Sequence, residues 1–347
     1  MKIVIATVQV PFIKGGAENL AANLRKELIG RGFEVEIVAI PFKWYPTNCL
    51  VDMMKVARLI DLTEVNGTPI DLLIGLKFPA FHAKHENKVI WMLHQHRQAY
   101  ELWGTQYSDL HNAKNGEAVR KQIISNDNEH IREAKKVFTI SKTVSDRLQK
   151  YNNIPSTPLY HPPSNFKQLH SNDFQDYIFC PSRIDGFKRQ HILVEALKYT
   201  KTPVKVLLAG KGSGGYQKKI KEMVERNSLG KKVFLLGWIS EEEKIKYYSN
   251  ALAVYNGPYE EDYGYVSLEA FFSGKPVITH IDSGGTKEFV RNNINGFVVE
   301  PNPVAVAEKL DYFYQNKQKA KQMGWNGQDL IKKMNISWDY VIERLIK

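Results

Sequence analysis

Two glutamates near residue 265 have the spacing and surroundings of a site for a phosphorylated sugar. Glu261 lies in a predicted loop, and Glu269 lies about one turn inside a helix predicted to begin near Tyr265, just after Gly264. The first amides of a helix have no partner within it and carry the positive end of its dipole, which favours a phosphate. Carboxylates accept hydrogen bonds from the paired hydroxyls of a sugar or ribose. The alternative, that Glu269 only faces solvent, is disfavoured by its apolar neighbours.

A second cluster carries positive charge. Arg183 and Lys188 lie on either side of Gly186, after a strand predicted over 177–181. An arginine fork and a lysine point charge at one sheet edge are suited to a diphosphate. By itself this pattern is also compatible with an ordinary basic loop.

Residues 210–215 read G-K-G-S-G-G and satisfy the literal dinucleotide motif G-x-G-x-x-G. That motif also requires an acidic residue at the end of the next strand, to bind a ribose. The next predicted strand, 233–237, is followed by Trp-Ile-Ser, and the motif is not at the first turn of its domain. We therefore expect a tight glycine turn near a ligand, with no nicotinamide or flavin cofactor.

The elements that must position these residues alternate between apolar runs and amphipathic stretches. This rhythm predicts parallel α/β sheets. Prolines cluster over 155–163 and predict a domain boundary, after which the rhythm restarts. We expect two tandem Rossmann-like, doubly wound domains with a cleft between them, and place the segments at 1–162, 163–325 and, for a final helix, 326–347. Strands are predicted at 2–7, 34–40, 71–75, 88–94, 136–140, 177–181, 204–210, 233–237, 251–255 and 276–280, and helices at 17–31, 143–151, 191–199, 216–227, 241–250 and 265–273.

Composition narrows the class of protein. The 347 residues carry a formal net charge of +11, spread along the whole chain with acids interleaved. Diffuse charge disfavours a nucleic-acid partner and suits an anionic small substrate, a phospholipid surface or a merely soluble basic surface. Cys49 and Cys180 lie far apart and are expected to be buried thiols of a reducing compartment, which predicts a cytoplasmic location.

Together the motifs over 182–300 resemble the retaining glycosyltransferases of the two-domain GT-B type, in the large family GT4 (glycosyl transferases group 1). Glu261 and Glu269 match the E-x7-E signature of that family, and Arg183 and Lys188 match its R…K pair. The resemblance extends over most of the second domain and is patchy in the first. Further matching segments are Gly274–Ile278, Ser283–Glu288, Asn295–Val298 and, in the first domain, the glycine-rich loop Gly15–Glu18.

The resemblance implies a role for each matching residue. Glu261 is expected to bind hydroxyls of the donor sugar and Glu269 the ribose, while Arg183 and Lys188 hold the diphosphate and stabilise it as it leaves. His94 resembles a histidine near the donor sugar, unless it is a core residue with satisfied hydrogen bonds, and His96 and Arg97 are candidate acceptor contacts. Further donor contacts are expected from the backbone of Gly15, Gly16, Gly264, Tyr265 and Val266.

The implied activity is a retaining, hexosyl-type transfer from a UDP- or GDP-sugar to a saccharide or lipid-linked acceptor, in surface polysaccharide or glycoconjugate assembly. The sequence contains no D-x-D metal motif, so neither a metal nor a cofactor is expected. A peripheral contact with the inner face of the membrane is a further expectation. The alternative is a catalytically idle, nucleotide-sugar-binding subunit of a polysaccharide-synthesis complex.

Overall fold

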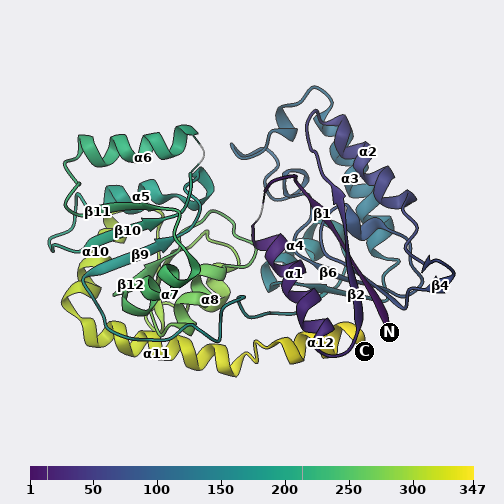
Figure 1. Ribbon diagram of the computed structural model, residues 1–347. Helices are drawn as coiled ribbons and strands as arrows, with labels where there is room; N and C mark the ends of the chain where they lie inside the picture. The colour runs from purple at the N-terminus through teal and green to yellow at the C-terminus, as the bar shows by residue number, and fades with distance from the viewer. Residues whose placement is uncertain (14, 213) are drawn as a thin grey trace. The chain divides into compact units, whose positions relative to one another are not determined.

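The computed structural model describes residues 1–13, 15–212 and 214–347, and these divide into two compact units. Unit 1 comprises Met1–Ser164 together with Ser337–Lys347, and unit 2 comprises Asn165–Ile336. Each unit contains a six-stranded sheet with helices packed around it (Figure 1). The α/β class and the two Rossmann-like domains expected from the sequence are confirmed.

The sheet of unit 1 is parallel throughout and has the strand order β2-β1-β5-β6-β7-β8. Its central strands are apolar runs buried on both faces, as parallel sheets require. A small antiparallel hairpin of β3 and β4 lies outside this sheet. The strands are β1 (Lys2–Gln9), β2 (Glu34–Pro41), β3 (Glu64–Val65), β4 (Thr68–Pro69), β5 (Leu72–Gly75), β6 (Lys88–Met92), β7 (Lys136–Thr139) and β8 (Thr157–Pro158).

The helices of unit 1 follow the sequence pattern unevenly. The α1 helix buries the predicted stripe of Leu20, Leu24 and Leu28, whereas α2 and α3 have no counterpart in the sequence prediction. The buried positions of α3 include Asp127 and His130, so apolar periodicity does not reveal this helix. The helices are α1 (Gly16–Ile29), α2 (Asn48–Leu59), α3 (Gly116–Ile131), α4 (Lys142–Asn152) and α12 (Trp338–Ile346), with 3-10 turns η1 (Ala80–His82), η2 (Arg97–Ala99) and η3 (Leu110–Asn112).

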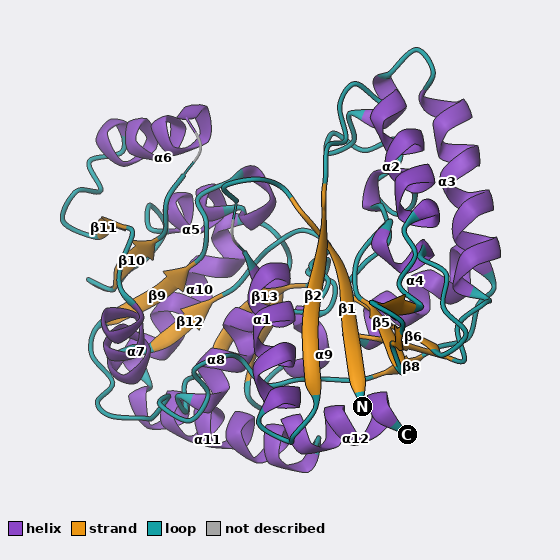
Figure 2. Ribbon diagram, turned by 45° about the vertical axis from the view of Figure 1, so that its right-hand side comes forward, coloured by secondary structure: helices purple, strands orange, loops and turns teal. Residues whose placement is uncertain are grey.

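The sheet of unit 2 is also parallel, with the order β11-β10-β9-β12-β13-β14 (Figure 2). Counted within the unit this is 3-2-1-4-5-6, the order of the dinucleotide-binding Rossmann fold. Its strands are β9 (Tyr177–Pro181), β10 (Lys205–Ala209), β11 (Val233–Gly237), β12 (Ala253–Tyr255), β13 (Val277–His280) and β14 (Gly296–Val299).

Helices cover the sheet of unit 2, where α5 packs against α6 and α10, and α8 packs against α11. Apolar residues of α5, α6 and α10 form one continuous core with the sheet strands. The helices are α5 (Gln190–Ala196), α6 (Gly214–Arg226), α7 (Glu241–Asn250), α8 (Tyr265–Phe272), α9 (Thr286–Phe289), α10 (Pro303–Gln315) and α11 (Lys317–Lys333), with a 3-10 turn η4 (Gly186–Lys188).

Two expectations from the sequence need correction. The boundary placed between residues 325 and 326 falls inside α11, which continues to Lys333. The helix ends shortly before Asn335, which has a φ of 50°. The short helix α12 then lies beside α1 in unit 1 (Figures 1 and 2). Of the two cysteines, Cys180 is buried but Cys49 is only half-buried, and both are free thiols.

Among the helices of the described chain, none is both long enough and apolar enough to cross a membrane.

Candidate functional site

The predicted chemistry of unit 2 lies at the carboxyl ends of β9 and β12. These two strands are neighbours, and the order of the strands reverses between them. At such a switch point the outgoing loops diverge and leave room for a ligand. Lys188, in the loop after β9, donates from Nζ to Oε2 of Glu261, in the loop after β12. The two side chains are 21% and 27% exposed, so a ligand can reach both.

The loop that carries Lys188 is held by its own polar residues. The carboxylate of Asp185 accepts a hydrogen bond from the Lys188 backbone amide at 3.1 Å. The buried Gln190 side chain donates to the Arg183 carbonyl at 2.7 Å and to the Ser182 hydroxyl at 2.9 Å. Arg183 itself projects outward, 76% exposed, with its guanidinium 3.4 Å from the Asp185 carboxylate. An exposed cation, Arg183, therefore lies near the mostly buried cation of Lys188.

The literal dinucleotide motif has a structural explanation in this loop. Gly210 has a φ of 146°, and a Cβ there would come within 2.2 Å of the Ser182 carbonyl oxygen. The close approach is secured by hydrogen bonds from the Ser182 amide to Ala209 at 2.9 Å and from the Ile184 amide to Lys211 at 3.1 Å. The first glycine thus allows the loop bearing Arg183 to pack on the end of β10. Ser213 of the motif lies outside the described residues.

Arg189 is a structural anchor of the site that sequence reasoning missed. It is buried, and its guanidinium bonds both carboxylate oxygens of Asp282, at 2.6 and 2.8 Å. It also donates to the carbonyls of Gly257 at 2.9 Å and Pro258 at 2.7 Å. One side chain therefore ties together the loops after β9, β12 and β13. Burial raises the pKa of Asp282, but the hydrogen bond from Arg189 outweighs this and holds the pKa below its ordinary value.

The position of Arg189 could not be read from the sequence alone. Its backbone φ of 52° lies in the left-handed region, which is uncommon for residues other than glycine. Its partner, Asp282, is 93 residues away in the chain. The only available signal was an arginine directly after Lys188 in the basic cluster.

The α8 helix begins where the sequence predicts, at Tyr265. Gly264 precedes it with a φ of 97°, and a Cβ there would lie 2.9 Å from Thr286 Cα. Only glycine fits this position without strain. The buried Asn256 side chain holds the first turn of α8 in place. It donates hydrogen bonds to the hydroxyls of Ser267 at 3.0 Å and Thr286 at 3.3 Å. The amides of the first turn therefore have a fixed direction at the edge of the sheet.

Glu269 does not face solvent. It is buried, and its carboxylate accepts hydrogen bonds from Tyr248 at 2.8 Å and from Lys244 at 3.0 Å, both on α7. Burial alone would lower the pKa of Lys244, but the charges of Glu269 and Glu241 raise it. Burial, and then the Glu269 charge, raise the pKa of Tyr248 well above its ordinary value. The carboxylate is thus held in one orientation by groups that stay protonated.

Two further glycines bring the loop after β13 onto Glu261. A Cβ on Gly284 would lie 2.3 Å from the Glu261 carbonyl oxygen, and one on Gly285 would lie 2.5 Å from that of Asp262. The Gly285 amide donates to the Glu261 carbonyl at 2.7 Å. The segment matched to the family over 283–288 therefore supports the backbone of Glu261.

The other predicted residues belong to unit 1. Gly15 precedes α1 in an extended conformation, and its amide donates to the Glu18 carboxylate at 2.7 Å. Gly16 is the first residue of α1. The amide expected to bind phosphate is therefore capped by a carboxylate of its own helix in this structure.

The histidine segment of unit 1 lies in the loop after β6. The strand ends at Met92, so His94 lies two residues beyond it and does not end the strand as predicted. Nδ1 of His94 lies 2.6 Å from the Gln95 carbonyl. Burial, and then the charge of His94, lower the pKa of His96 to about 3, which makes His96 neutral at pH 7. Arg97 donates to Glu101 at 2.5 Å.

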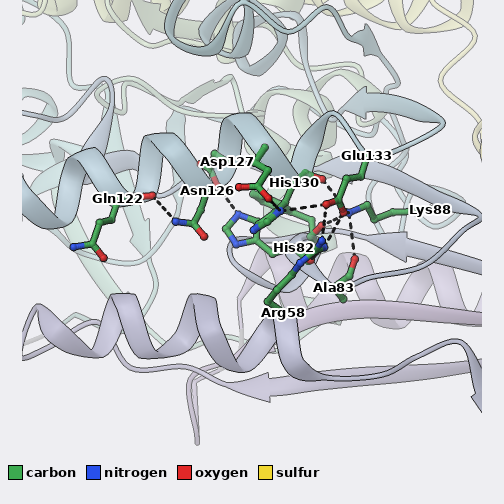
Figure 3. A network of polar contacts seen from close by, with 11 residues as sticks. Arg58, His82, Ala83, Lys88, Gln122, Asn126, Asp127, His130 and Glu133 are labelled. Carbon is green, nitrogen blue, oxygen red and sulfur yellow. Dashed lines mark hydrogen bonds and ion pairs between the residues drawn. The ribbon is translucent and has the colours of Figure 1, made fainter.

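A buried polar network supports unit 1 at the start of β6 (Figure 3). Glu133 accepts two hydrogen bonds from Arg58, at 2.6 and 2.7 Å, and one from the buried Lys88 at 3.1 Å. Burial raises the pKa of Glu133, but these cations outweigh it and hold the pKa at about 2. Deeper in, Asp127 contacts His82 at 2.7 Å and accepts from the Tyr100 hydroxyl at 2.6 Å.

Glu129, His130 and Glu133 have the proximity of a metal site. However, Glu133 already forms ion pairs with Arg58 and Lys88, and these positive charges repel a metal ion. We interpret His130 and Glu133 as part of the structural network in Figure 3.

Residues 163–330 match the model of the family described as "Glycosyl transferases group 1". The human protein named alpha-1,3/1,6-mannosyltransferase ALG2 is 31% identical over 130 residues, which is 35% of this chain and 31% of that protein. The chain therefore spans about a third of the length of this curated relative.

Solved structures match over nearly the whole chain. Sucrose-phosphate synthase from Thermosynechococcus elongatus gives a TM-score of 0.79 at 17% identity, covering 99% of this chain and 97% of that one. HepE from Anabaena, solved in complex with UDP-glucose, gives a TM-score of 0.72 at 16% identity, covering 99% and 98%. At these identities the likeness establishes the fold of both units.

Proposed function

We propose that this chain, whose residues 163–330 belong to the group 1 glycosyltransferases and whose two Rossmann-like units give it the GT-B fold, transfers a sugar from a nucleoside diphosphate sugar to an acceptor hydroxyl. The observation that carries the proposal is the Lys188–Glu261 pair at the switch point of unit 2. A cation for phosphate and a carboxylate for hydroxyls lie together there, and both are accessible. The neighbouring α8 terminus adds oriented amides.

Each residue of this cluster has a distinct part. Lys188 and the exposed Arg183 bind the diphosphate and stabilise its charge as it leaves, which is electrostatic catalysis. Glu261 gives up its contact with Lys188 and accepts hydrogen bonds from the donor sugar. Glu269, held by Tyr248 and Lys244, accepts from the ribose hydroxyls. Each of these proposed roles follows from the chemistry of the side chain and is applied here to the bound donor.

The reaction we propose retains the configuration at the anomeric carbon. The acceptor oxygen forms a bond to that carbon on the face that the diphosphate leaves, the bond from carbon to phosphate oxygen breaks, and the hydroxyl proton passes to the leaving phosphate. Lys188 and Arg183 supply the positive charge in place of a metal ion. The absence of a D-x-D motif from the sequence supports this part of the proposal.

The setting we propose is glycoconjugate assembly. The human relative is named a mannosyltransferase, and the HepE structure contains UDP-glucose, so UDP- and GDP-sugars are the first donors to test. A saccharide or lipid-linked acceptor, a cytoplasmic location and a peripheral contact with the membrane complete the proposal. Nucleic acid has no part in it, because the positive charge is diffuse.

The test is release of nucleoside diphosphate from a panel of UDP-, GDP- and ADP-sugars in the presence of EDTA, for the wild-type chain and for Glu261→Ala. We expect release with one donor, and at least a hundredfold loss in the variant, because the variant cannot hold the sugar in the reactive position. Activity that requires added divalent metal would refute metal independence. Donor binding without turnover, across a broad set of saccharide and lipid-linked acceptors, would instead favour the idle binding subunit.

A further inference from the structure

The α11 helix of unit 2 departs from the even mix of charges in the chain as a whole. Its 17 residues contain five lysines and one acidic residue, Asp329. The whole chain, by comparison, has 48 lysines and arginines and 37 aspartates and glutamates. Figure 1 shows α11 along the lower margin of unit 2. A local excess of positive charge creates a potential that attracts anions.

The helix has one buried side and one exposed side. Its buried positions are small or apolar and recur at helical spacing. They are Ala320, Met323, Gly324, Gly327, Leu330 and Ile331. The positions on the opposite side are all exposed and are charged, polar or aromatic. They are Gln318, Lys321, Gln322, Trp325, Asp329 and Lys332. One face of α11 therefore packs on unit 2, and the other presents lysines to solvent.

A tryptophan lies in the middle of the exposed face. Trp325 is 45% exposed, and the Lys321 ammonium lies 5.1 Å from the centroid of its ring. Of the five lysines, Lys317 is paired with Asp176 at 2.6 Å. The other four form no ion pair within the described chain. Most of the positive charge of α11 is therefore not neutralised by the described residues.

A cavity of about 350 Å³ adjoins this face and has a basic lining. It lies between α10, α11 and the turn before β14, and its nine lining residues include Lys309 and Lys319 but no aspartate or glutamate. Ile294, another lining residue, is 52% exposed, and its carbonyl accepts a hydrogen bond from Asn326 of α11 at 2.7 Å. Two cations beside an exposed apolar side chain suit a phosphate that is joined to an apolar chain.

A bilayer with anionic lipids matches these features better than another polyanion does. The surface potential of such a bilayer attracts lysines, and tryptophan is enriched at the depth of the headgroups. A basic helix face with an exposed tryptophan is typical of helices that lie in the plane of a membrane. Nucleic acid would use the lysines equally well but would offer no apolar layer to Ile294.

We propose that the exposed face of α11, together with the adjoining cavity, docks unit 2 on a bilayer that contains anionic phospholipids. We call this surface the α11 face and define it by Ile294, Lys319, Lys321, Trp325 and Lys332. The inference rests on the peripheral membrane contact in the proposed function and names the surface that makes it. It does not depend on the transfer reaction.

The experiment measures cosedimentation of the full chain with vesicles of phosphatidylcholine, with and without phosphatidylglycerol. We expect binding only to vesicles that contain phosphatidylglycerol, and weaker binding as salt is raised. Lys321→Glu/Lys332→Glu should weaken binding about tenfold or more, because two attractive charges become repulsive. Trp325→Ala should also weaken binding but should keep the preference for phosphatidylglycerol, since it removes an apolar contact and no charge.

A second readout shows whether Trp325 itself reaches the lipid. Lipids brominated in the acyl chains quench the fluorescence of a tryptophan that contacts them. The wild-type fluorescence should fall on such vesicles, and Trp325→Phe should lose most of that fall. The matched control is Trp238→Phe, at another exposed tryptophan of unit 2, which should keep the fall. Equal quenching in wild type and Trp325→Phe would contradict the placement of this residue in the bilayer.

The charge control is Lys219→Glu/Lys221→Glu, at two exposed lysines of α6. Figures 1 and 2 draw α6 and α11 at opposite margins of unit 2, so this variant should bind vesicles as wild type does. Urea unfolding should be nearly unchanged in both double variants, because all four lysines are exposed. Absence of vesicle binding in wild type, an equal loss in the two double variants, or wild-type binding in Lys321→Glu/Lys332→Glu would overturn the proposal. Binding of duplex DNA without binding of vesicles would overturn it as well.

The outcome is separable from the proposed transfer function. Donor binding is measured on the same samples by calorimetric titration with nucleoside diphosphate sugars and depends on Glu261. A chain that binds vesicles through the α11 face but binds no nucleoside diphosphate sugar would keep this inference and refute the transferase. A chain that transfers sugar but binds no vesicles would refute this inference alone.

Discussion

At the scale of single residues, the candidate site depends on a pair of charges that satisfy each other before a ligand arrives. Lys188 and Glu261 are in contact, and each is mostly shielded from water. In the function we propose, a nucleoside diphosphate sugar replaces this one contact with two, a phosphate on the lysine and a hydroxyl on the glutamate. The two side chains are charge-balanced in the free chain, so the contacts with a bound donor must outweigh the contact that is lost.

Arg189 provides the first residue-scale prediction. Arg189→Gly removes the contacts with Asp282, Gly257 and Pro258, although glycine suits the positive φ better than arginine does. We expect a loss of about 1–3 kcal/mol of unfolding free energy, because a partly buried carboxylate loses its partner. Urea unfolding measures this, and nucleotide-sugar affinity should fall in parallel, because the loop of Lys188 loses its anchor.

The exposed neighbour Arg183 is the control for this prediction. Arg183→Ala should change the free energy of unfolding by less than about 0.5 kcal/mol. The double variant Arg189→Gly/Asp282→Asn should recover part of the lost stability, since the uncompensated charge is gone. Wild-type stability in Arg189→Gly would show that the three loops hold their positions without it.

Residue type and local spacing are enough to single out some residues of the candidate site from the sequence alone. Glu261 and Lys188 were singled out by residue type and loop position, and they are in contact. Glu269 was placed on its helix correctly, but its partners Lys244 and Tyr248 come from another helix that no local pattern connects to it. The role of Arg189 depends on a left-handed backbone and a distant aspartate, so only the fold reveals it.

At the scale of elements, unit 1 is joined by polar contacts as well as by apolar packing. Glu133, two residues after the end of α3, binds Arg58 of α2 and Lys88 of β6. Burial lowers the pKa of Lys88, although the hydrogen bond and charge of Glu133 oppose this shift. Keeping the lysine charged in this position therefore costs free energy. Carbonyl oxygens of Ala83 at 3.2 Å and His130 at 2.9 Å offset part of that cost. The buried polar residues Asp127 and His130 of α3 explain why apolar periodicity does not reveal this helix.

This network gives a prediction about pH. The pKa of Glu133 is about 2 in the folded chain, against an ordinary value of 4.5. A depressed carboxyl pKa contributes stability above the unfolded value, and that contribution is lost as pH falls from about 5 towards 2. Glu133→Gln should therefore be less stable than wild type at pH 7, and the difference should shrink at pH 3. Urea unfolding followed at both pH values measures it.

A suitable control for the pH prediction is Glu86→Gln, an exposed carboxylate in the loop before β6. It should leave the pH dependence of unfolding unchanged. A Glu133→Gln chain that loses as much stability as wild type between pH 7 and pH 3 would contradict the assignment of the low pKa to this network.

At the scale of the whole molecule, strand order explains why residues 73 positions apart come together. In unit 2, Lys188 and Glu261 follow the two strands at which the order reverses. The alternation of strands and helices predicts the α/β class from sequence, because the apolar period and the length of each segment are enough to distinguish a strand from a helix. The order of the strands and the end of the last domain depend on long-range packing, so the boundary at 325 was misplaced inside α11.

The measurement that tests the central claim most directly is a calorimetric titration of wild type, Lys188→Gln and Glu261→Gln with nucleoside diphosphates and their sugar conjugates, for uracil, guanine and adenine. Glu242→Gln, on the exposed side of α7, is the control. We predict that Lys188→Gln weakens both kinds of ligand at least tenfold, since it loses hydrogen bonds to a charged group. Glu261→Gln should weaken only the sugar conjugate. Wild-type affinity in both variants, or an equal loss for both ligands in Glu261→Gln, would contradict the assignment of this pair to the donor.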